Sequence, residues 1–112
     1  MDLNIVVYGK NKEIIETLVR IINKNEGWHA LCIDKQSVLE NHISNHSTEI
    51  LLYSSSISKT ETENIECWIL NNYPSIKQIH HYGGGGGLLY SEIQCAILGI
   101  ESINKPALNC II

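Results

Sequence analysis

Serines, glycines and lysines gather where apolar runs of the sequence end. A serine-rich turn follows the run from Glu49 to Tyr53, and five consecutive glycines follow the run from Ile76 to Tyr82. Hydroxyl groups, ammonium groups and the backbone N–H groups of glycines before a helix are the donors that bind phosphate and other anions. The residues that would form such an anion site are Ser54, Ser55, Gly83, Gly84, Gly85, Gly86, Gly87 and Lys105.

The five-glycine run has a second interpretation. It satisfies neither of the phosphate-loop patterns GxGxxG and GxxxxGK[ST]. Each glycine also costs about 0.5 to 1 kcal/mol in conformational entropy relative to alanine when it is ordered. We therefore favour a hinge or a loop that adapts to a partner over an anion site.

Histidine spacing does not predict a metal site. His42 and His46 are four residues apart and share one helix face, but no third ligand is identifiable, so a solvated helix face is preferred. His80 and His81 point to opposite faces of a strand and cannot readily bind one ion together. We expect each of these two to be packed or hydrogen-bonded, and we predict no metal and no cofactor.

Cysteine usage is typical of reduced thiols rather than of catalysis or disulfides. The four cysteines are far apart, form no CxxC pair and follow no secretory signal, so we expect mostly buried, intracellular thiols. They are Cys32, Cys67, Cys95 and Cys110. No nucleophile follows the first apolar run, where Gly9 and Lys10 stand, and we predict that the chain is not an enzyme.

Bulk composition excludes several classes of partner. The chain has 112 residues, which suits one domain, and 44% of them are hydrophobic. A formal net charge of -4 gives no basic footprint for direct nucleic-acid binding. The apolar runs are far shorter than the roughly 20 residues that span a bilayer. We expect a soluble, cytoplasmic domain with no membrane contact.

Apolar runs alternate with helical patterns along the chain, and each predicted element can be given a range. Strands are predicted at Asn4 to Tyr8, Trp28 to Ile33, Glu49 to Tyr53, Ile76 to Tyr82 and, briefly, Glu101 to Asn104. Helices are predicted from Lys12 to Asn25 behind an Asn11 cap, from a Ser37 and Glu40 capping box, from a Thr60 and Glu63 capping box, and from Leu88 to Leu98.

This alternation predicts the fold class. Strands separated by helices favour an α/β domain with a doubly wound, parallel five-stranded sheet in the flavodoxin-like order 2-1-3-4-5. Only six residues follow Pro106, so the final helix is expected to be short or missing. We treat residues 1–112 as one domain, which would be the N-terminal regulatory part of any longer protein.

Together these elements resemble the receiver domain of bacterial response regulators. The most specific segment, Leu98 to Pro106 (LGIESINKP), is similar to the family's stretch from the end of helix four through strand five to Lys-Pro. Tyr73 to Ile79 (YPSIKQI) is similar to the stretch between helix three and strand four. The resemblance implies that Lys105 occupies the position of the family's active-site lysine.

The rest of the family's phosphorylation site is not matched. Where the family keeps two acidic metal ligands after strand one, this chain has Tyr8 and Gly9. Ser54 stands at the position of the phosphoacceptor aspartate, and Tyr82 at that of the switch threonine or serine. Of this set only Lys105 is retained, so the resemblance implies a degenerate receiver.

Two functions follow as expectations. The first is a phosphorylation-independent, receiver-like module that signals through a protein partner or as a homodimer, in the manner of a transcription regulator's signalling domain. The second is binding of a phosphate-bearing small molecule or nucleotide by the glycine loop with Ser54 and Lys105. Among the aromatic residues, Tyr90 is the candidate for an exposed contact, whereas Trp68 is expected in the core.

Overall fold

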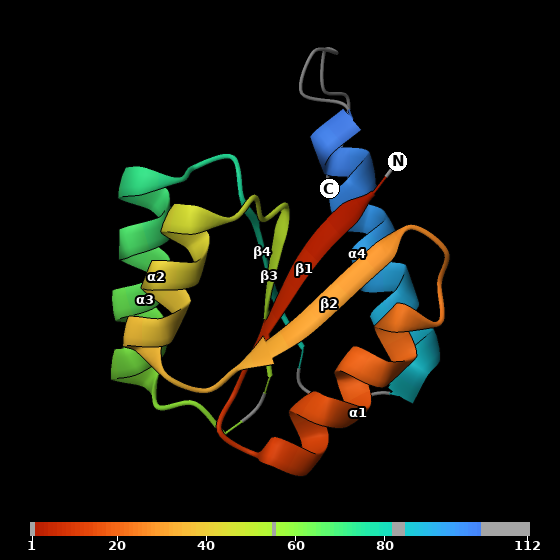
Figure 1. Ribbon diagram of the computed structural model, residues 1–112, viewed down its shortest axis with the longest axis horizontal. Coiled ribbons are helices and arrows are strands. Elements are labelled where there is room, and N and C mark those ends of the chain that lie inside the picture. Colours follow the sequence, from red (N-terminus) through yellow and green to blue (C-terminus); the bar gives the residue numbers. More distant parts are fainter. Residues whose placement is uncertain (1, 55, 82–84, 102–112) are drawn as a thin grey trace.

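The computed structural model describes residues 2–54, 56–81 and 85–101, and its centre is a parallel sheet (Figure 1). The described strands lie in the order β2-β1-β3-β4, and every neighbouring pair is parallel. Their bounds are β1 Leu3–Tyr8, β2 Trp28–Ile33, β3 Ile50–Tyr53 and β4 Lys77–His80. This order confirms the prediction for the first four strands.

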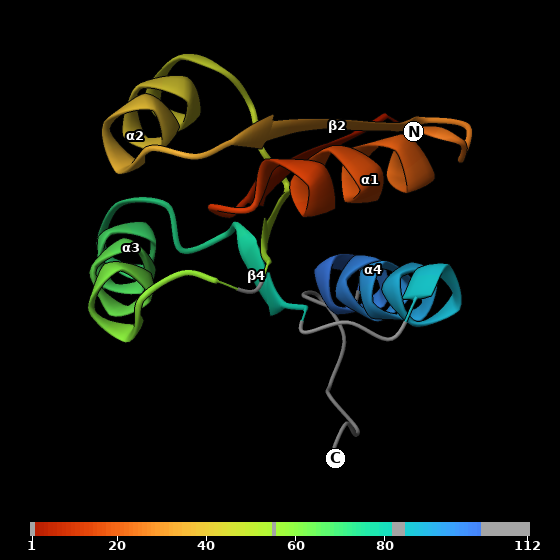
Figure 2. The same ribbon diagram turned by 90° about the horizontal axis from the view of Figure 1, so that it is seen from below.

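Four helices cover both faces of this sheet. They are α1 Lys12–Asn23, α2 Gln36–Asn45, α3 Lys59–Asn72 and α4 Gly85–Glu101. Figure 2 shows α2 and α3 on one side of the sheet and α1 and α4 on the other. Because successive residues of a strand point to opposite faces, β1 contributes Ile5 and Val7 to one core and Val6 and Tyr8 to the other.

The C-terminal part departs from the predicted boundaries. The expected fifth strand at Glu101 to Asn104 is not seen among the described residues, because Glu101 ends α4 and residues 102–104 lie outside them. The glycine run is also not wholly a loop, since Gly85, Gly86 and Gly87 form the first turn of α4. Glycines alone disfavour a helix, but the amphipathic segment that follows them continues the helix toward its N-terminus to include Gly85, Gly86 and Gly87.

Helix caps were predicted with mixed success. Asn11 caps α1 as expected, its side chain accepting a hydrogen bond from the Ile14 N–H. The proposed cap at Thr60 is wrong, because α3 begins two residues earlier and Ser58 accepts from the Glu61 N–H. The Ser37 cap is also wrong: α2 starts at Gln36 without a side-chain cap.

The cysteines were expected to be mostly buried, and this prediction is wrong for the three that are described. Cys32, Cys67 and Cys95 are all exposed and free. Each occurs within an apolar stretch, but β2 lies at the edge of the sheet, and Cys67 and Cys95 fall on outward helix positions. No described helix is long and apolar enough to cross a membrane.

Candidate functional site

The candidate site lies where β1 and β3 end side by side, because Tyr8 and Tyr53 are register partners at the last position of both strands. Ligands of open parallel sheets bind beyond the carboxyl ends of their strands, so this is the expected place. Tyr8 is fully buried and points toward α3. Its hydroxyl donates a hydrogen bond to the Glu61 carboxylate in the first turn of that helix.

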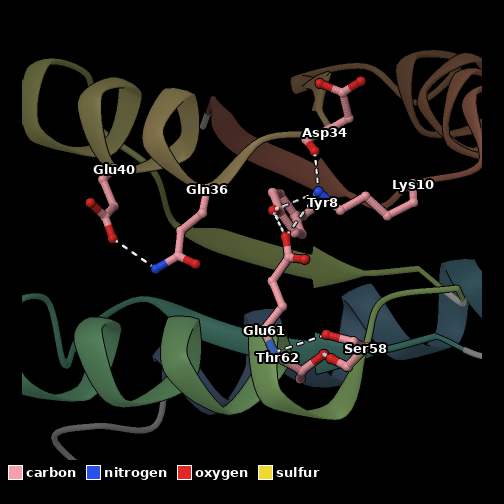
Figure 3. A network of polar contacts seen from close by, with 8 residues as sticks. All are labelled: Tyr8, Lys10, Asp34, Gln36, Glu40, Ser58, Glu61 and Thr62. Carbon is pink, nitrogen blue, oxygen red and sulfur yellow. Dashed lines mark hydrogen bonds and ion pairs between the residues drawn. The ribbon is translucent and has the colours of Figure 1, made fainter.

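Lys10 joins this tyrosine and this carboxylate. Its Nζ lies 3.0 Å from Glu61 Oε2 and 3.4 Å from the Tyr8 hydroxyl, and it donates a 2.5 Å bond to the backbone carbonyl of Asp34. Figure 3 shows the three side chains converging between β1 and α3, while the Asp34 carboxylate points away from them. We call Tyr8, Lys10 and Glu61 the strand-one cluster.

The surroundings of the strand-one cluster shift the pKa values of Tyr8 and Glu61 in opposite directions. Burial, together with the hydrogen bond to Glu61 and the charge of that carboxylate, raises the pKa of the Tyr8 phenol well above its ordinary value. Burial alone would raise the pKa of Glu61, but hydrogen bonds from Tyr8 and Lys10 and the Lys10 charge outweigh it and lower that pKa. A neutral phenol and an ionised carboxylate are therefore favoured near neutral pH.

Gly9 and Ser54 fill the space beside the strand-one cluster. A Cβ atom on Gly9 would lie 2.7 Å from Ile15 Cγ2 and 2.9 Å from Ser54 Cβ. Ser54 is itself buried, and its N–H donates to the Tyr8 carbonyl at 2.8 Å. The position that an acidic residue occupies in the resembled family thus has no room for any side chain.

The carboxyl end of β4 is held by two histidine–glutamate pairs. His80 Nε2 lies 2.6 Å from Glu66 Oε2 of α3, and the His80 ring stacks on Tyr53 with a centroid distance of 4.6 Å. His81 Nδ1 lies 2.5 Å from Glu92 Oε1 of α4. The predicted placement on opposite faces is confirmed, and each histidine joins β4 to a different helical layer.

A cleft of about 510 Å³ opens next to Ser54, between β3, β4 and α3. Its hydroxyl and ammonium groups suit an anion, but the Glu63 and Glu66 carboxylates line the same space. The other members of the predicted anion site do not assemble there in the described chain: Gly85, Gly86 and Gly87 are helical. Tyr82, Ser55, Gly83, Gly84 and Lys105 lie outside the described residues.

The remaining candidate ligands are placed as ring contacts rather than as a metal site. The His42 and His46 rings stack at a centroid distance of 4.7 Å. Burial, and the nearby His46, lower the pKa of His42. Within residues 2–54, 56–81 and 85–101, no group of three or more His, Cys, Asp or Glu side chains is arranged to hold a metal ion.

The structure places Tyr90 at the surface and Trp68 partly in the core. Tyr90 is 47% exposed, as expected of a surface residue, and its ring stacks on Trp28 at 5.4 Å. Trp68 is half-buried and packs with Tyr73 against the core beneath α2 and α3.

Sequence reasoning missed Glu61, the residue that completes the strand-one cluster. The signal was present as Ser58-Lys59-Thr60-Glu61, a serine followed three residues later by a glutamate. In an ordinary capping box that glutamate would turn back to its own helix start. Here it reaches the end of β1, a contact that only the packing of α3 against the sheet reveals.

Comparison with known proteins adds one similarity. No family model and no curated protein matches the sequence. The receiver domain of the stress response regulator RcsB from Escherichia coli, solved in its non-phosphorylated form, superposes with a TM-score of 0.63 over 90% of this chain and 77% of that one. The two sequences are 12% identical. At this identity the similarity concerns architecture, and it shows that the chain has the fold of a response-regulator receiver domain.

Proposed function

We propose that this chain is a receiver-like regulatory module that acts through protein–protein contacts and does not use aspartyl phosphorylation. The observation that carries the proposal is the strand-one cluster, together with the close packing around Gly9 that leaves no space for a side chain there. Divalent cations that assist phosphoryl transfer take carboxylate oxygens as ligands. At this end of β1 the carboxylate of Glu61 is held by an ammonium and a phenol instead.

Ser54 supports the same proposal. It occupies the end of β3, where the resembled family carries its phosphoacceptor, and it is 3% exposed. A serine hydroxyl needs an adjacent base or a metal to act as a nucleophile. In the resembled family a metal assists this step, and the positions of its acidic ligands after β1 are Tyr8 and Gly9 in this chain.

The surface of α4 supports a role in contacts. Tyr90 and Leu98 are 47% and 61% exposed on this helix, large apolar side chains that a partner would bury. A protein partner or a second copy of the chain would meet them directly. The module would then regulate by binding rather than by catalysis.

The proposal is tested with beryllofluoride, a mimic of the phosphoryl group on aspartate, in the presence and absence of Mg²⁺. We expect no Mg²⁺-dependent change in amide NMR shifts, thermal midpoint or sedimentation coefficient. A phosphorylatable receiver domain measured in parallel gives the positive response. A change in this chain that requires both beryllofluoride and Mg²⁺ would show that an acidic phosphorylation site operates and would overturn the proposal.

The contact surface has its own test. Tyr90→Ser and Leu98→Ser in one variant should weaken self-association or partner binding while leaving the fold intact, as judged by NMR. Leu70→Ser, on the exposed surface of α3 (Leu70 is 61% exposed), is the matched control. Equal effects of both variants would contradict a specific role for α4.

A further inference from the structure

The sheet has an outer edge at β2, whose described neighbour is β1 on one side. The strand reads Trp-His-Ala-Leu-Cys-Ile and contains no Asp, Glu, Lys, Arg or Pro. Edge strands present backbone groups that pair with strands of other chains, and proteins commonly protect them with charge, proline or a covering element. This strand carries neither an acidic or basic charge of these types nor a proline, which leaves a covering element from another part of the chain as its protection.

The Asn23 side chain covers the middle of this edge. Asn23 is the last residue of α1, and its Oδ1 accepts a hydrogen bond from the Ala30 N–H at 2.8 Å. Its Nδ2 donates to the Ala30 carbonyl at 3.2 Å. An asparagine amide carries one acceptor and a donor group side by side, so it makes the two bonds that an adjacent strand would make with Ala30.

Removal of the Asn23 side chain would expose the backbone groups of β2 to a strand from another chain. The groups of Ala30 point outward, and by the two-residue period of a strand those of Trp28 and Cys32 share that direction. The Trp28 N–H already donates to the Asn25 carbonyl at 3.1 Å, so the Ala30 groups are the centre of the pairing surface. An antiparallel second copy centred on Ala30 would place His29 opposite Leu31 and Trp28 opposite Cys32. None of these pairs brings like charges of acidic or lysine side chains together, so the strand is compatible with itself.

We propose that Asn23 is an edge guard: its amide occupies the strand-pairing groups of Ala30 and prevents a second copy of the chain from extending the sheet at β2. The contact is autoinhibitory toward β2-to-β2 pairing. The inference concerns the opposite side of the molecule from β4 and does not depend on the proposed absence of phosphorylation.

The first test is Asn23→Ala in the full chain under reducing conditions, studied by sedimentation velocity across a hundredfold concentration range. We expect the variant to self-associate at concentrations at least tenfold lower than the wild type does. The control is Asn25→Ala, because the Asn25 side chain bonds the carbonyls of Ile21 and Ile22 at the same helix end. Asn25 contacts β2 through its backbone carbonyl, which accepts from the Trp28 N–H at 3.1 Å and is kept in this variant. Equal association of Asn23→Ala and Asn25→Ala would overturn the proposal, because it would reflect loosening of the helix end.

A rescue variant identifies the surface. Adding Leu31→Lys to Asn23→Ala places a charge on the edge strand at a residue that is 40% exposed, and should return association to the wild-type level. Association that persists in the double variant would contradict pairing through β2. If Asn23→Ala does not fold, Asn23→Ser removes the paired amide without adding a charge, and an unchanged oligomeric state in that variant would equally contradict the proposal.

Discussion

The carboxyl ends of β1 and β4 are both fastened to helices by pairs of acidic and basic side chains, but they are fastened differently. At β1, one lysine and one phenol share a single carboxylate of α3. At β4, two adjacent histidines each take a separate carboxylate, Glu66 of α3 and Glu92 of α4. The first end is joined to one helical layer and the second to both.

The carboxyl ends of β1 and β4 differ in how tightly they are packed and in how their charged side chains are paired. At β1 a lysine and a phenol share the Glu61 carboxylate, whereas at β4 each carboxylate faces a single imidazole. The β1 end is also closed by the contact of Gly9 with Ser54, while a cleft lies between β3, β4 and α3. The β1 end is therefore built as a fixed structural junction, and the β4 end as the more adaptable one.

The largest effect is expected from breaking the close packing at β1. Gly9→Val would place side-chain atoms where Ile15 and Ser54 already lie, so we expect a loss of about 3 kcal/mol in the free energy of unfolding. Urea denaturation monitored by circular dichroism measures it. Gly27→Ala is the comparison variant, because Gly27 has a φ of 82° and its replacement costs left-handed backbone strain of about 1 to 2 kcal/mol rather than a packing clash. Wild-type stability in Gly9→Val would show that the junction is loosely packed.

Removing the shared carboxylate comes next. Glu61→Ala leaves the buried Tyr8 hydroxyl with only the distant Lys10 contact, and an unsatisfied buried hydroxyl costs about 2 kcal/mol. Chemical denaturation of Glu61→Ala, Tyr8→Phe and the double variant gives their coupling. Additive losses in this cycle would mean that the hydrogen bond between Tyr8 and Glu61 contributes little.

The corresponding change at β4 should be smaller. His81→Leu places an apolar side chain in a buried position. Its former partner Glu92, whose side chain is 24% exposed, stays partly accessible to water. We expect a loss of about 1 kcal/mol, together with chemical-shift changes in α4. His80→Leu is the matched variant, and its shifts should appear in α3 and at Tyr53, on which the His80 ring stacks, but not in α4. Shifts in both helices from either variant would contradict the separation of the two pairs.

Lys10→Met tests the contribution of the lysine charge at β1. Because the Lys10 side chain is 38% exposed, solvent weakens its ion pair with Glu61, and we expect a loss of less than about 1 kcal/mol. Thermal unfolding at low and high salt separates charge from packing: high salt should reduce the difference from wild type. A salt-independent difference would assign the effect to packing of the lysine stem on Tyr8.

The smallest effect is a change in acid sensitivity. The pKa of Glu61 is lowered in the folded chain, so its contribution to stability is complete above the ordinary value of 4.5 and is lost as the pH falls through the folded pKa. Glu61→Gln should therefore lose less stability than wild type on acidification below about pH 4.5. Glu63→Gln, whose carboxylate lies 4.0 Å from Lys59, is the control. Parallel acid profiles for wild type and Glu61→Gln would contradict the lowered pKa.

Much of the fold could be predicted because it depends on local patterns. The run Asn4 to Tyr8 is apolar on both faces, which is typical of a central parallel strand, and β1 is buried on both faces. Asn11 before an amphipathic run marked a helix start correctly. Exposure of Cys32 was not predictable from its apolar neighbours, since it depends on β2 lying at the edge of the sheet.

Local residue patterns are enough to predict the alternation of strands and helices, and the lack of an acidic pair after β1 is read directly from the chain as Tyr8 and Gly9. What replaces that pair depends on how elements far apart in the sequence pack together. Glu61 is 53 residues from Tyr8, and its carboxylate meets the phenol because α3 packs across the end of β1. Asn23 likewise protects Ala30 only because α1 ends beside the outer strand. Such contacts depend on the positions of elements in space, which local residue patterns do not encode.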